Sequence, residues 1–508
     1  MKINLIGAAL LAACGGPAAP PTPPPVPVFS AQSGFARVAS EFLDAHEAAH
    51  PVDATRAGSH AHDARLPSVF PGDLERRSLD VRAYLTRLEG VSPRTLRGAD
   101  AVDYRLIDHA LRAELLDLEE VGGWRRDPAR YAALARDGTS PLVLGRFAPL
   151  EERMRSMAGR WHETPMLLRA ARQNLDASLV PGLLADHAAD VARATRAFIA
   201  DDVPVAVDAQ GLARVDVRAL NEWEAARRRA VASLDSFTVW LERDLAARAA
   251  GDFRLGSHLL QRTLLYRHHL DIPLGELYAL NRQAIDEYRE WMGRVAMTVD
   301  PMRRPHVIID SLTAAVRGGS ELIPPRLAPP PIAPEGSSAR SRVRALLAPT
   351  ALAESWLHYT DLTALSDPAI DDATRLAGIR RALHGHALLH AMLTLHSGEA
   401  SLEEAARDFA SIALVDLDFA ERETRRVAID PGAAVPAIGR MQIFALRDRL
   451  RAERRGAFDE EAFERDLIGL GLPVPLAAAA MLGREPGPLL VTGVRTPGLP
   501  PLPGPLQR

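Results

Sequence analysis

Apolar residues recur every three or four positions along most of the chain. Tyr104, Ile107, Leu111, Leu115 and Leu118 recur at steps of three and four, so they share one face of a helix. Positions 35, 38, 42 and 45 repeat this spacing nearer the N-terminus. Short breaks that contain proline separate such runs, and alanine and arginine, which both favour helix, are abundant. The pattern predicts an all-α protein.

Strand-like alternation is confined to one short stretch. Residues 203–217 place valine at alternate positions near a Gln210-Gly211 pair, which is typical of a small β-hairpin. We therefore expect a large, two-lobed helical body with at most this minor β-hairpin.

Proline and glycine mark the expected boundaries within this body. Residues 318–349 are rich in proline and predict a long loop between an N-terminal helical lobe, 35–317, and a C-terminal helical lobe, 350–484. Residues 485–508 are again rich in proline and glycine and predict a flexible tail.

The first residues have the pattern of an export signal. Lys2 precedes an apolar run that is too short to span a bilayer, which needs about 20 apolar residues. Leu11-Ala12-Ala13-Cys14 then matches a lipobox, so residues 1–13 are predicted to be a lipoprotein signal peptide and Cys14 the lipidated residue. The alternative is a buried or free thiol behind an ordinary secretion signal. Residues 14–34, rich in proline, would form a stalk that holds the body off the membrane.

This N-terminus predicts where the protein resides and what it contacts. Cys14 is the only cysteine of the chain, which suits an oxidising compartment outside the cytoplasm. We expect a lipoprotein of the cell envelope, anchored to a lipid bilayer through Cys14 and facing away from the cytoplasm.

Composition restricts the possible partners without naming one. The chain has 508 residues, 47% hydrophobic and 25% charged, with a net charge of -4, which is ordinary for a globular protein. This balance gives no basis for a nucleic-acid partner. The sequence contains no phosphate-binding glycine loop, dinucleotide fingerprint or nucleophile-elbow pentapeptide.

Several segments together resemble one bacterial family, domain of unknown function 885. The similar segments are Pro51 to Pro67, Trp124 to Tyr131, Ala170 to Leu175, Phe253 to Gly256, Glu354-Ser355-Trp356-x-x-Tyr359, Leu395 to Ala405 and Arg426 to Gly439. Each segment is weakly specific alone, and their order and spacing carry the resemblance. It implies an all-helical fold with a central cleft, similar to zinc metallopeptidases of the gluzincin type.

The resemblance also implies a zinc site, and most of that site is missing here. Members would carry a His-Glu-x-x-Pro-Gly-His-His segment before the residue that matches Glu354, which would be the third zinc ligand. Between His306 and His358 this chain has no histidine. We therefore expect no catalytic residue, no metal ligand and no cofactor, and a remnant of the family cleft. That remnant would consist of Glu354, Trp356, Tyr359, His396 and Arg426.

Two histidine pairs offer alternative zinc ligands. His46-Glu47-Ala48-Ala49-His50 has the spacing of a zinc-peptidase helix, but Pro51 disfavours helical geometry at His50, so a solvated helix end is the favoured interpretation. His386 and His390 also share a helix face and could be joined by Glu354. Because Ala387 stands where a general base is needed, we favour a histidine-rich helix face.

These observations support one leading functional hypothesis and two rivals. The leading hypothesis is an envelope lipoprotein that is a catalytically inactive relative of a zinc metallopeptidase and binds a peptide or protein partner. The first rival is an active zinc metallopeptidase with a rebuilt metal site. The second is a structural envelope protein without a ligand.

Overall fold

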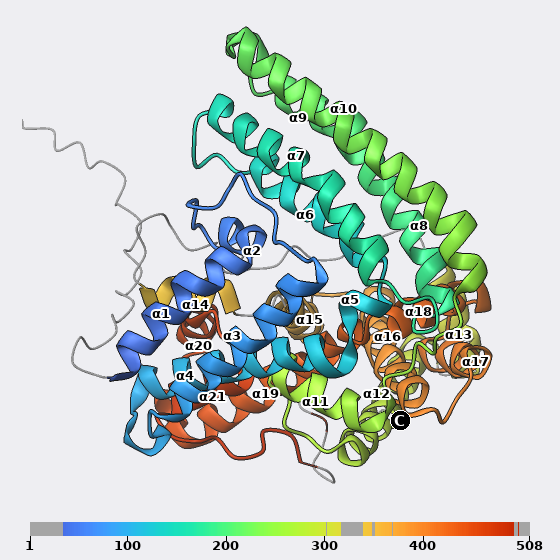
Figure 1. The fold of residues 1–508 in the computed structure, drawn as a ribbon. Helices are drawn as coiled ribbons and strands as arrows, with labels where there is room; N and C mark the ends of the chain where they lie inside the picture. The colour runs from blue at the N-terminus through green and yellow to red at the C-terminus, as the bar shows by residue number, and fades with distance from the viewer. Residues whose placement is uncertain are drawn as a thin grey trace, which may run out of the picture.

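The computed structural model describes residues 34–300, 302–315, 339–347, 351–367, 369–491 and 496, and within them the protein is all-α (Figure 1). The described residues contain no strand, apart from an isolated bridge between Pro181 and Gly251. The predicted signal peptide, Cys14 and residues 15–33 of the stalk lie outside the described residues. The all-α prediction is confirmed.

Helices follow one another along the whole described chain. In order they are α1 (Gly34–Ala49), α2 (Pro51–Arg56), α3 (Pro71–Glu89), α4 (Gly98–Leu116), α5 (Gly123–Arg126), α6 (Ala129–Leu144), α7 (Leu150–Asn174), α8 (Gly182–Ala197), α9 (Val203–Asp208), α10 (Val217–Trp240), α11 (Gly256–His268), α12 (Leu274–Val299), α13 (Pro305–Ala315), α14 (Ala339–Leu347), α15 (Ala351–Ala364), α16 (Asp372–Ser397), α17 (Leu402–Ala413), α18 (Leu417–Ile429), α19 (Val435–Arg454), α20 (Glu460–Leu470) and α21 (Val474–Leu482). Short 3-10 or π turns extend or connect several of them, namely η1 (Pro93–Thr95), η2 (Asp117–Val121), η3 (Phe198–Asp202), η4 (Leu212–Arg214), η5 (Leu241–Leu245), η6 (Ala246–Arg248), η7 (Pro431–Ala434) and η8 (Arg455–Ala457).

The expected hairpin at residues 203–217 is not formed. Val203 and Val207 are buried on one face of α9, whereas Val205 between them is 70% exposed. Burial at positions i and i+4 follows the helical repeat, because alternate residues of a strand would all face one side. Packing on neighbouring helices therefore decides this segment against the strand preference of valine.

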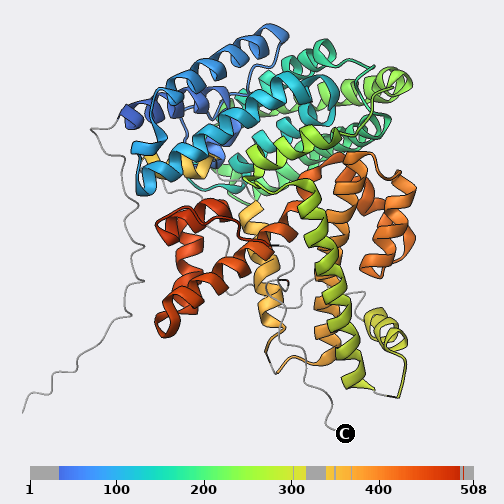
Figure 2. The same cartoon turned by 90° about the horizontal axis from the view of Figure 1, so that it is seen from below.

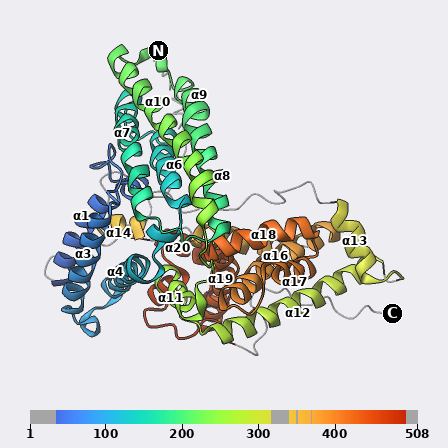
Figure 3. The ribbon, with the colours of Figure 1, turned by 45° about the vertical axis from the view of Figure 1, so that its right-hand side comes forward.

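Two hydrophobic cores hold the body together. One lies in the bundle of α6 to α10, where the rings of Trp161 and Trp223 are wholly buried and 5.3 Å apart; this bundle stands apart from the remaining helices in Figure 3. The other joins the first helices to the second half of the chain, since Phe35, Trp291 and Trp356 belong to it. Figure 2 shows the blue helices lying over the yellow-to-red ones. The first helices therefore share a core with the predicted C-terminal lobe.

Part of the predicted loop 318–349 is a helix. Residues 339–347 form α14, where proline is absent. Arg340 and Arg344 from α14 pair with Asp103 of α4, which is wholly buried, with N–O distances of 2.5 and 2.8 Å. Paired buried charges fix the place of α14 on α4. Residues 318–338 and 348–350 of the predicted loop lie outside the described residues.

The beginning of the predicted tail is also packed rather than loose. Leu490 is 4% exposed and belongs to the larger core, and Glu485 accepts two hydrogen bonds of 2.8 Å from Arg105. The prediction of a flexible tail from residue 485 is therefore wrong for residues 485–491. Burial of Leu490, which follows Pro486 and Pro488, holds this part of the chain on the core.

Among the described residues, no single helix is both long and apolar enough to cross a bilayer. The pair α20 and α21 satisfies both conditions together, although the two helices meet at a bend of 120°.

Candidate functional site

Glu354, Trp356 and Tyr359 lie on α15 in different surroundings. Glu354 is exposed, whereas Trp356 and Tyr359 are buried in the larger core with their rings 5.0 Å apart. The Tyr359 hydroxyl donates to either of two carboxylates of α20, Glu460 at 3.2 Å and Glu464 at 3.4 Å. The two aromatic residues thus pack α15 onto the core, and the carboxylate faces solvent.

His396 and Arg426 have structural contacts of their own. The ring of His396 is buried at the end of α16, where Nδ1 accepts a hydrogen bond from the Leu255 backbone N–H at 3.4 Å and Nε2 lies 3.2 Å from the Val427 carbonyl oxygen. Burial lowers the pKa of His396 to about 4, so the ring is neutral at pH 7. Arg426 is exposed on α18 and pairs with Glu423. Of these five residues, Trp356 and Tyr359 contact each other, whereas His396 and Arg426 have other partners.

The alternative pair on α16 is occupied by internal contacts. His386 is wholly buried, with Nδ1 2.8 Å from Asn281 Oδ1 and Nε2 2.8 Å from Arg440 Nη2. Because Arg440 donates to Nε2, Nδ1 carries the proton that it donates to Asn281, and neither nitrogen has a free lone pair. His390 Nε2 instead lies 3.4 Å from Asp408. The structure does not bring His386, His390 and Glu354 into one cluster of ligand atoms among the described residues.

The first histidine pair does meet a third potential ligand. Pro51 begins α2, and His50 between the two helices has φ of −123° and ψ of 61°, so the helical path is interrupted as the sequence predicts. The rings of His46 and His50 nevertheless lie 4.2 Å apart. Glu114 of α4 joins them, and the ligand atoms of these three residues all lie within 4.8 Å of one another. Sequence reasoning missed Glu114, which lies 64 positions from His50.

A guanidinium group stands among these three residues. Arg77 of α3 donates to both carboxylate oxygens of Glu114, at 2.6 and 2.7 Å, and its Nη2 lies 3.3 Å from His46 Nδ1 and 3.5 Å from His50 Nε2. Burial raises the pKa of Glu114, but the neighbouring His50, Arg77 and His46 outweigh it and hold this pKa well below its ordinary value. Glu114 is therefore a carboxylate at neutral pH.

Glu47, the acidic residue of the His-Glu-x-x-His sequence, faces other partners. Its side chain is buried and accepts hydrogen bonds from Ser59 Oγ at 2.7 Å and from Arg342 of α14 at 2.6 and 3.1 Å. Both of its oxygens are thus engaged. A general base must reach the water that it deprotonates, so this arrangement does not suit Glu47 for that role.

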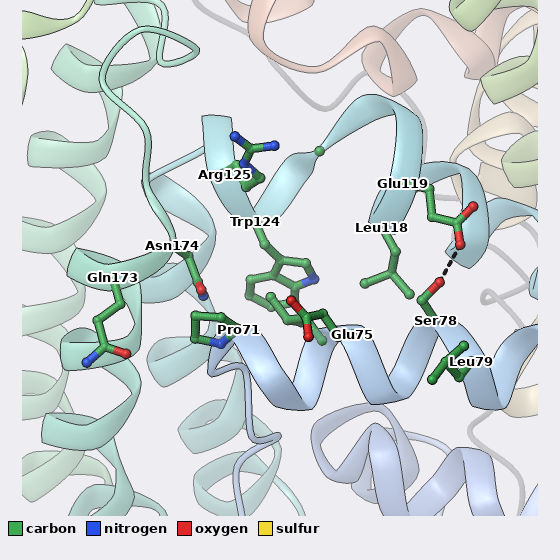
Figure 4. Close-up of a pocket in the computed structure, with 12 residues that line it drawn as sticks. Pro71, Glu75, Ser78, Leu79, Leu118, Glu119, Trp124, Arg125, Gln173 and Asn174 are labelled. Atoms are coloured by element: carbon green, nitrogen blue, oxygen red, sulfur yellow. Dashed lines mark hydrogen bonds between the residues drawn. The ribbon is translucent and has the colours of Figure 1, made fainter.

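An open pocket lies between α3, η2, α5 and the end of α7. Its volume is about 600 Å³, and Figure 4 shows its side chains around Trp124. Leu74, Leu79 and Leu118 supply further apolar surface along the pocket. The polar residues along it are Glu75, Ser78, Glu119, Arg125, Gln173 and Asn174. We call this feature the Trp124 pocket.

Hydrogen bonds fix one wall of the Trp124 pocket. The buried Asn174 side chain donates to the Val69 carbonyl oxygen at 2.6 Å and to the Tyr131 hydroxyl at 3.0 Å, and that hydroxyl donates to the Trp124 carbonyl oxygen at 2.6 Å. The Arg130 guanidinium lies 4.6 Å from the Trp124 ring centre. The segments that resemble the family include Trp124 and Asn174, but no pattern of residues indicates that the two line a pocket.

Three comparisons with known proteins relate the chain to others. A family model described as "Bacterial protein of unknown function (DUF885)" matches residues 51–318, which is more than half of the chain. No curated protein matches the chain.

Two solved structures are similar in fold. The first is described as a "putative lipoprotein of unknown function" from Shewanella oneidensis; it has a TM-score of 0.67 and 18% identity, and the match covers 89% of this chain and 100% of that one. The second, a "putative lipoprotein" from Colwellia psychrerythraea, has a TM-score of 0.66 and 12% identity, with 89% of this chain and 99% of that one covered. At these identities the likeness establishes the fold.

Proposed function

This chain belongs to the DUF885 family, and from that premise we propose that it is an envelope lipoprotein which binds a peptide or protein partner in the Trp124 pocket without hydrolysing it. The observation that carries the proposal is the Trp124 pocket itself, an open cavity of about 600 Å³ next to exposed apolar surface.

The proposed anchor rests on the sequence and on the description of the relatives. Leu11-Ala12-Ala13-Cys14 follows a short apolar run, and Cys14 is the only cysteine. Both solved structures that share the fold are described with the words "putative lipoprotein". A lipid on Cys14 tethers a body that would otherwise diffuse freely.

Absence of hydrolysis is supported by the surroundings of the presumed zinc ligands. Glu354 is exposed, and His386 has both ring nitrogens engaged by Asn281 and Arg440. Glu47 is held by Ser59 and Arg342. Since loss of a general base alone costs about 10² to 10⁴ in rate, a chain without one at either place is not expected to cleave peptides measurably.

The chemistry of the Trp124 pocket favours a peptide over a highly charged ligand. Leu79 lines the pocket and is 68% exposed, so an apolar side chain of a ligand would remove apolar surface from water on binding. Gln173 and Arg125 offer donors for carbonyl oxygens, and Glu75 offers an acceptor for amides. A pocket of this volume, lined by both apolar and polar residues, suits a ligand that consists of a few residues of an extended peptide.

The binding experiment compares two leucines that are similarly exposed. A phage library of random decapeptides is panned on the purified, untagged protein, and enriched peptides are measured by fluorescence polarisation. Leu79→Asp should weaken their binding by about tenfold or more, because it places a charge on the apolar wall. Leu144→Asp is the control, since Leu144 is 75% exposed and does not line the Trp124 pocket.

The same peptides test hydrolysis. Mass spectrometry after incubation with protein and zinc should show them intact. Zinc-dependent cleavage that disappears in Glu354→Gln or Glu47→Gln would establish the active-peptidase rival. Equal loss of binding in Leu79→Asp and Leu144→Asp, or no enriched peptide, would contradict the binding site.

The anchor has a separate test. Cys14→Ser should prevent lipidation, so the exported protein should move from the membrane fraction to the soluble fraction or stay unprocessed. Fractionation with the membrane equal to that of the wild type would contradict the lipoprotein assignment.

A further inference from the structure

The cluster of His46, His50 and Glu114 has no part in the function proposed above. We propose that these three residues bind a divalent transition-metal ion of the zinc class, and that the Arg77 guanidinium holds the same position when the metal is not bound.

The donor set and its spacing fit such an ion. Two imidazole nitrogens and a carboxylate oxygen are one of the ligand sets that zinc takes in sites with three protein ligands, at distances of about 2.0 to 2.2 Å. The closest pair here, His50 Nε2 and Glu114 Oε1, is 3.0 Å apart, and His46 Nδ1 lies 3.9 Å from Glu114 Oε2. Because all three ligand atoms lie within 4.8 Å of one another, rotations of side chains suffice to surround one ion.

Three separate elements position the ligands. His46 is in the last turn of α1, His50 is the residue between α1 and α2, and Glu114 is near the end of α4. The side chains of His46 and Glu114 are 11% and 14% exposed, whereas that of His50 is 29% exposed. The site is therefore largely shielded from water, with access for an ion on the His50 side.

Arg77 occupies the place of a cation within the cluster. Its Nη2 is 2.7 Å from Glu114 Oε2 and within 3.5 Å of a nitrogen of each histidine. A metal ion would need the same lone pairs and would be repelled by the guanidinium, so Arg77 must swing away when the metal binds. This competition weakens metal binding in the wild type, and removal of the Arg77 charge should strengthen it.

Because both carboxylate oxygens of Glu47 are already hydrogen-bonded, we assign the proposed metal ion a structural role and no role in hydrolysis. Arg342 and Ser59 hold both oxygens of Glu47, so no carboxylate is free beside the ion to deprotonate a bound water. The ion would join the α1–α2 junction to α4.

Zinc titration of full-length, untagged variants by isothermal calorimetry tests the proposal. Arg77→Met should bind one zinc ion about tenfold or more tightly than the wild type. Adding His50→Ala to Arg77→Met should abolish that binding. Arg82→Met is the matched control, because Arg82 lies on the same helix and pairs with Glu119 outside the cluster, so its zinc affinity should equal that of the wild type. Thermal melting establishes that each variant is folded.

A second measurement avoids the Arg77 variant altogether. Cobalt at high concentration should give the wild type visible absorption bands of a coordinated ion, and His50→Ala should remove them. If Arg77→Met is folded and binds no stoichiometric zinc, or if its zinc binding survives His50→Ala, the proposal is wrong. Whether or not that variant folds, absence of cobalt bands in the wild type, or bands that persist in His50→Ala, overturns it.

Discussion

Arg440 donates a hydrogen bond from Nη2 to Nε2 of His386 across 2.8 Å in the interior of the molecule. The two side chains are 2% and 0% exposed, and Asn281 accepts from the other nitrogen of the ring. Burial, followed by the positive charge of Arg440, lowers the pKa of His386 well below its ordinary value, so the imidazole stays neutral and accepts this bond. A histidine that resembles a zinc ligand in the sequence is thus a partner for a buried arginine.

Replacing His386 should therefore cost stability. His386→Leu leaves the Arg440 guanidinium without this acceptor, and loss of a buried hydrogen bond to a charged group typically costs about 1.5 to 3 kcal/mol. Urea unfolding followed by circular dichroism measures the loss. His390→Leu on the same helix is the control and should cost less than about 1 kcal/mol, because its partner Asp408 is 57% exposed. Similar losses for the two variants would show that the bond to Arg440 is unimportant.

The pairing of α14 with α4 leads to a second prediction. Asp103→Ala removes the shared partner of Arg340 and Arg344, and we expect a loss of about 3 to 5 kcal/mol in the free energy of unfolding. Glu119→Ala breaks an ion pair with Arg82, whose side chain is 58% exposed, and should cost no more than about 1 kcal/mol. Chemical denaturation compares the two, and an Asp103→Ala loss as small as that of the control would contradict a clamp on α14.

The end of the chain gives a third prediction from two adjacent residues. Leu490 is 4% exposed, so Leu490→Ala should cost about 2 to 5 kcal/mol through lost burial and a new cavity. Val491 is 49% exposed, so Val491→Ala should change stability by no more than about 0.5 kcal/mol. Thermal and urea melts of both variants measure the difference. If Leu490→Ala is neutral, residues 485–491 do not contribute to the core.

The helices could be predicted from the sequence wherever apolar residues repeat clearly every three or four positions. The spacing from Tyr104 to Leu118 gave α4, because burial of one face repeats every three or four residues in a helix. The valines at 203, 205 and 207 led to the wrong prediction of a hairpin. Their alternation suits a strand, but the first and last of them are also four residues apart and so share one face of a helix. Helix α14 was hidden by the prolines on both sides of it, and its stability comes from Asp103, which lies more than 200 positions away.

The candidate sites were less accessible because they depend on distances between remote segments. His46 and His50 were visible as a pair, whereas Glu114 and Arg77 have no sequence pattern that links them to it. Trp124 was visible as part of a family-like segment, but only the placement of α3, η2 and the end of α7 around it makes it the wall of a pocket. The spacing of residues along the sequence indicates which of them share one face of a helix. It does not indicate which helix faces pack against each other.

Acid should destabilise the protein in part through His396. In the folded state its pKa is lowered to about 4, chiefly by burial, whereas a histidine in the unfolded chain has a pKa of about 6.5. Below about pH 6.5 the unfolded state therefore binds a proton that the folded state does not, so the free energy of unfolding decreases as pH falls toward about 4. The contribution is absent above about pH 7, where both states leave the ring neutral.

The size of this contribution can be isolated with one substitution. A single histidine with this shift removes roughly 2 kcal/mol of stability between pH 7 and pH 5. His396→Asn cannot take up this proton, so its loss over that interval should be smaller than that of the wild type by about this amount. Urea unfolding at both pH values measures it, and His258→Asn, a change at an exposed position, should retain the pH dependence of the wild type. The same pH dependence in His396→Asn and wild type would mean that His396 takes up its proton in the folded state as readily as in the unfolded chain.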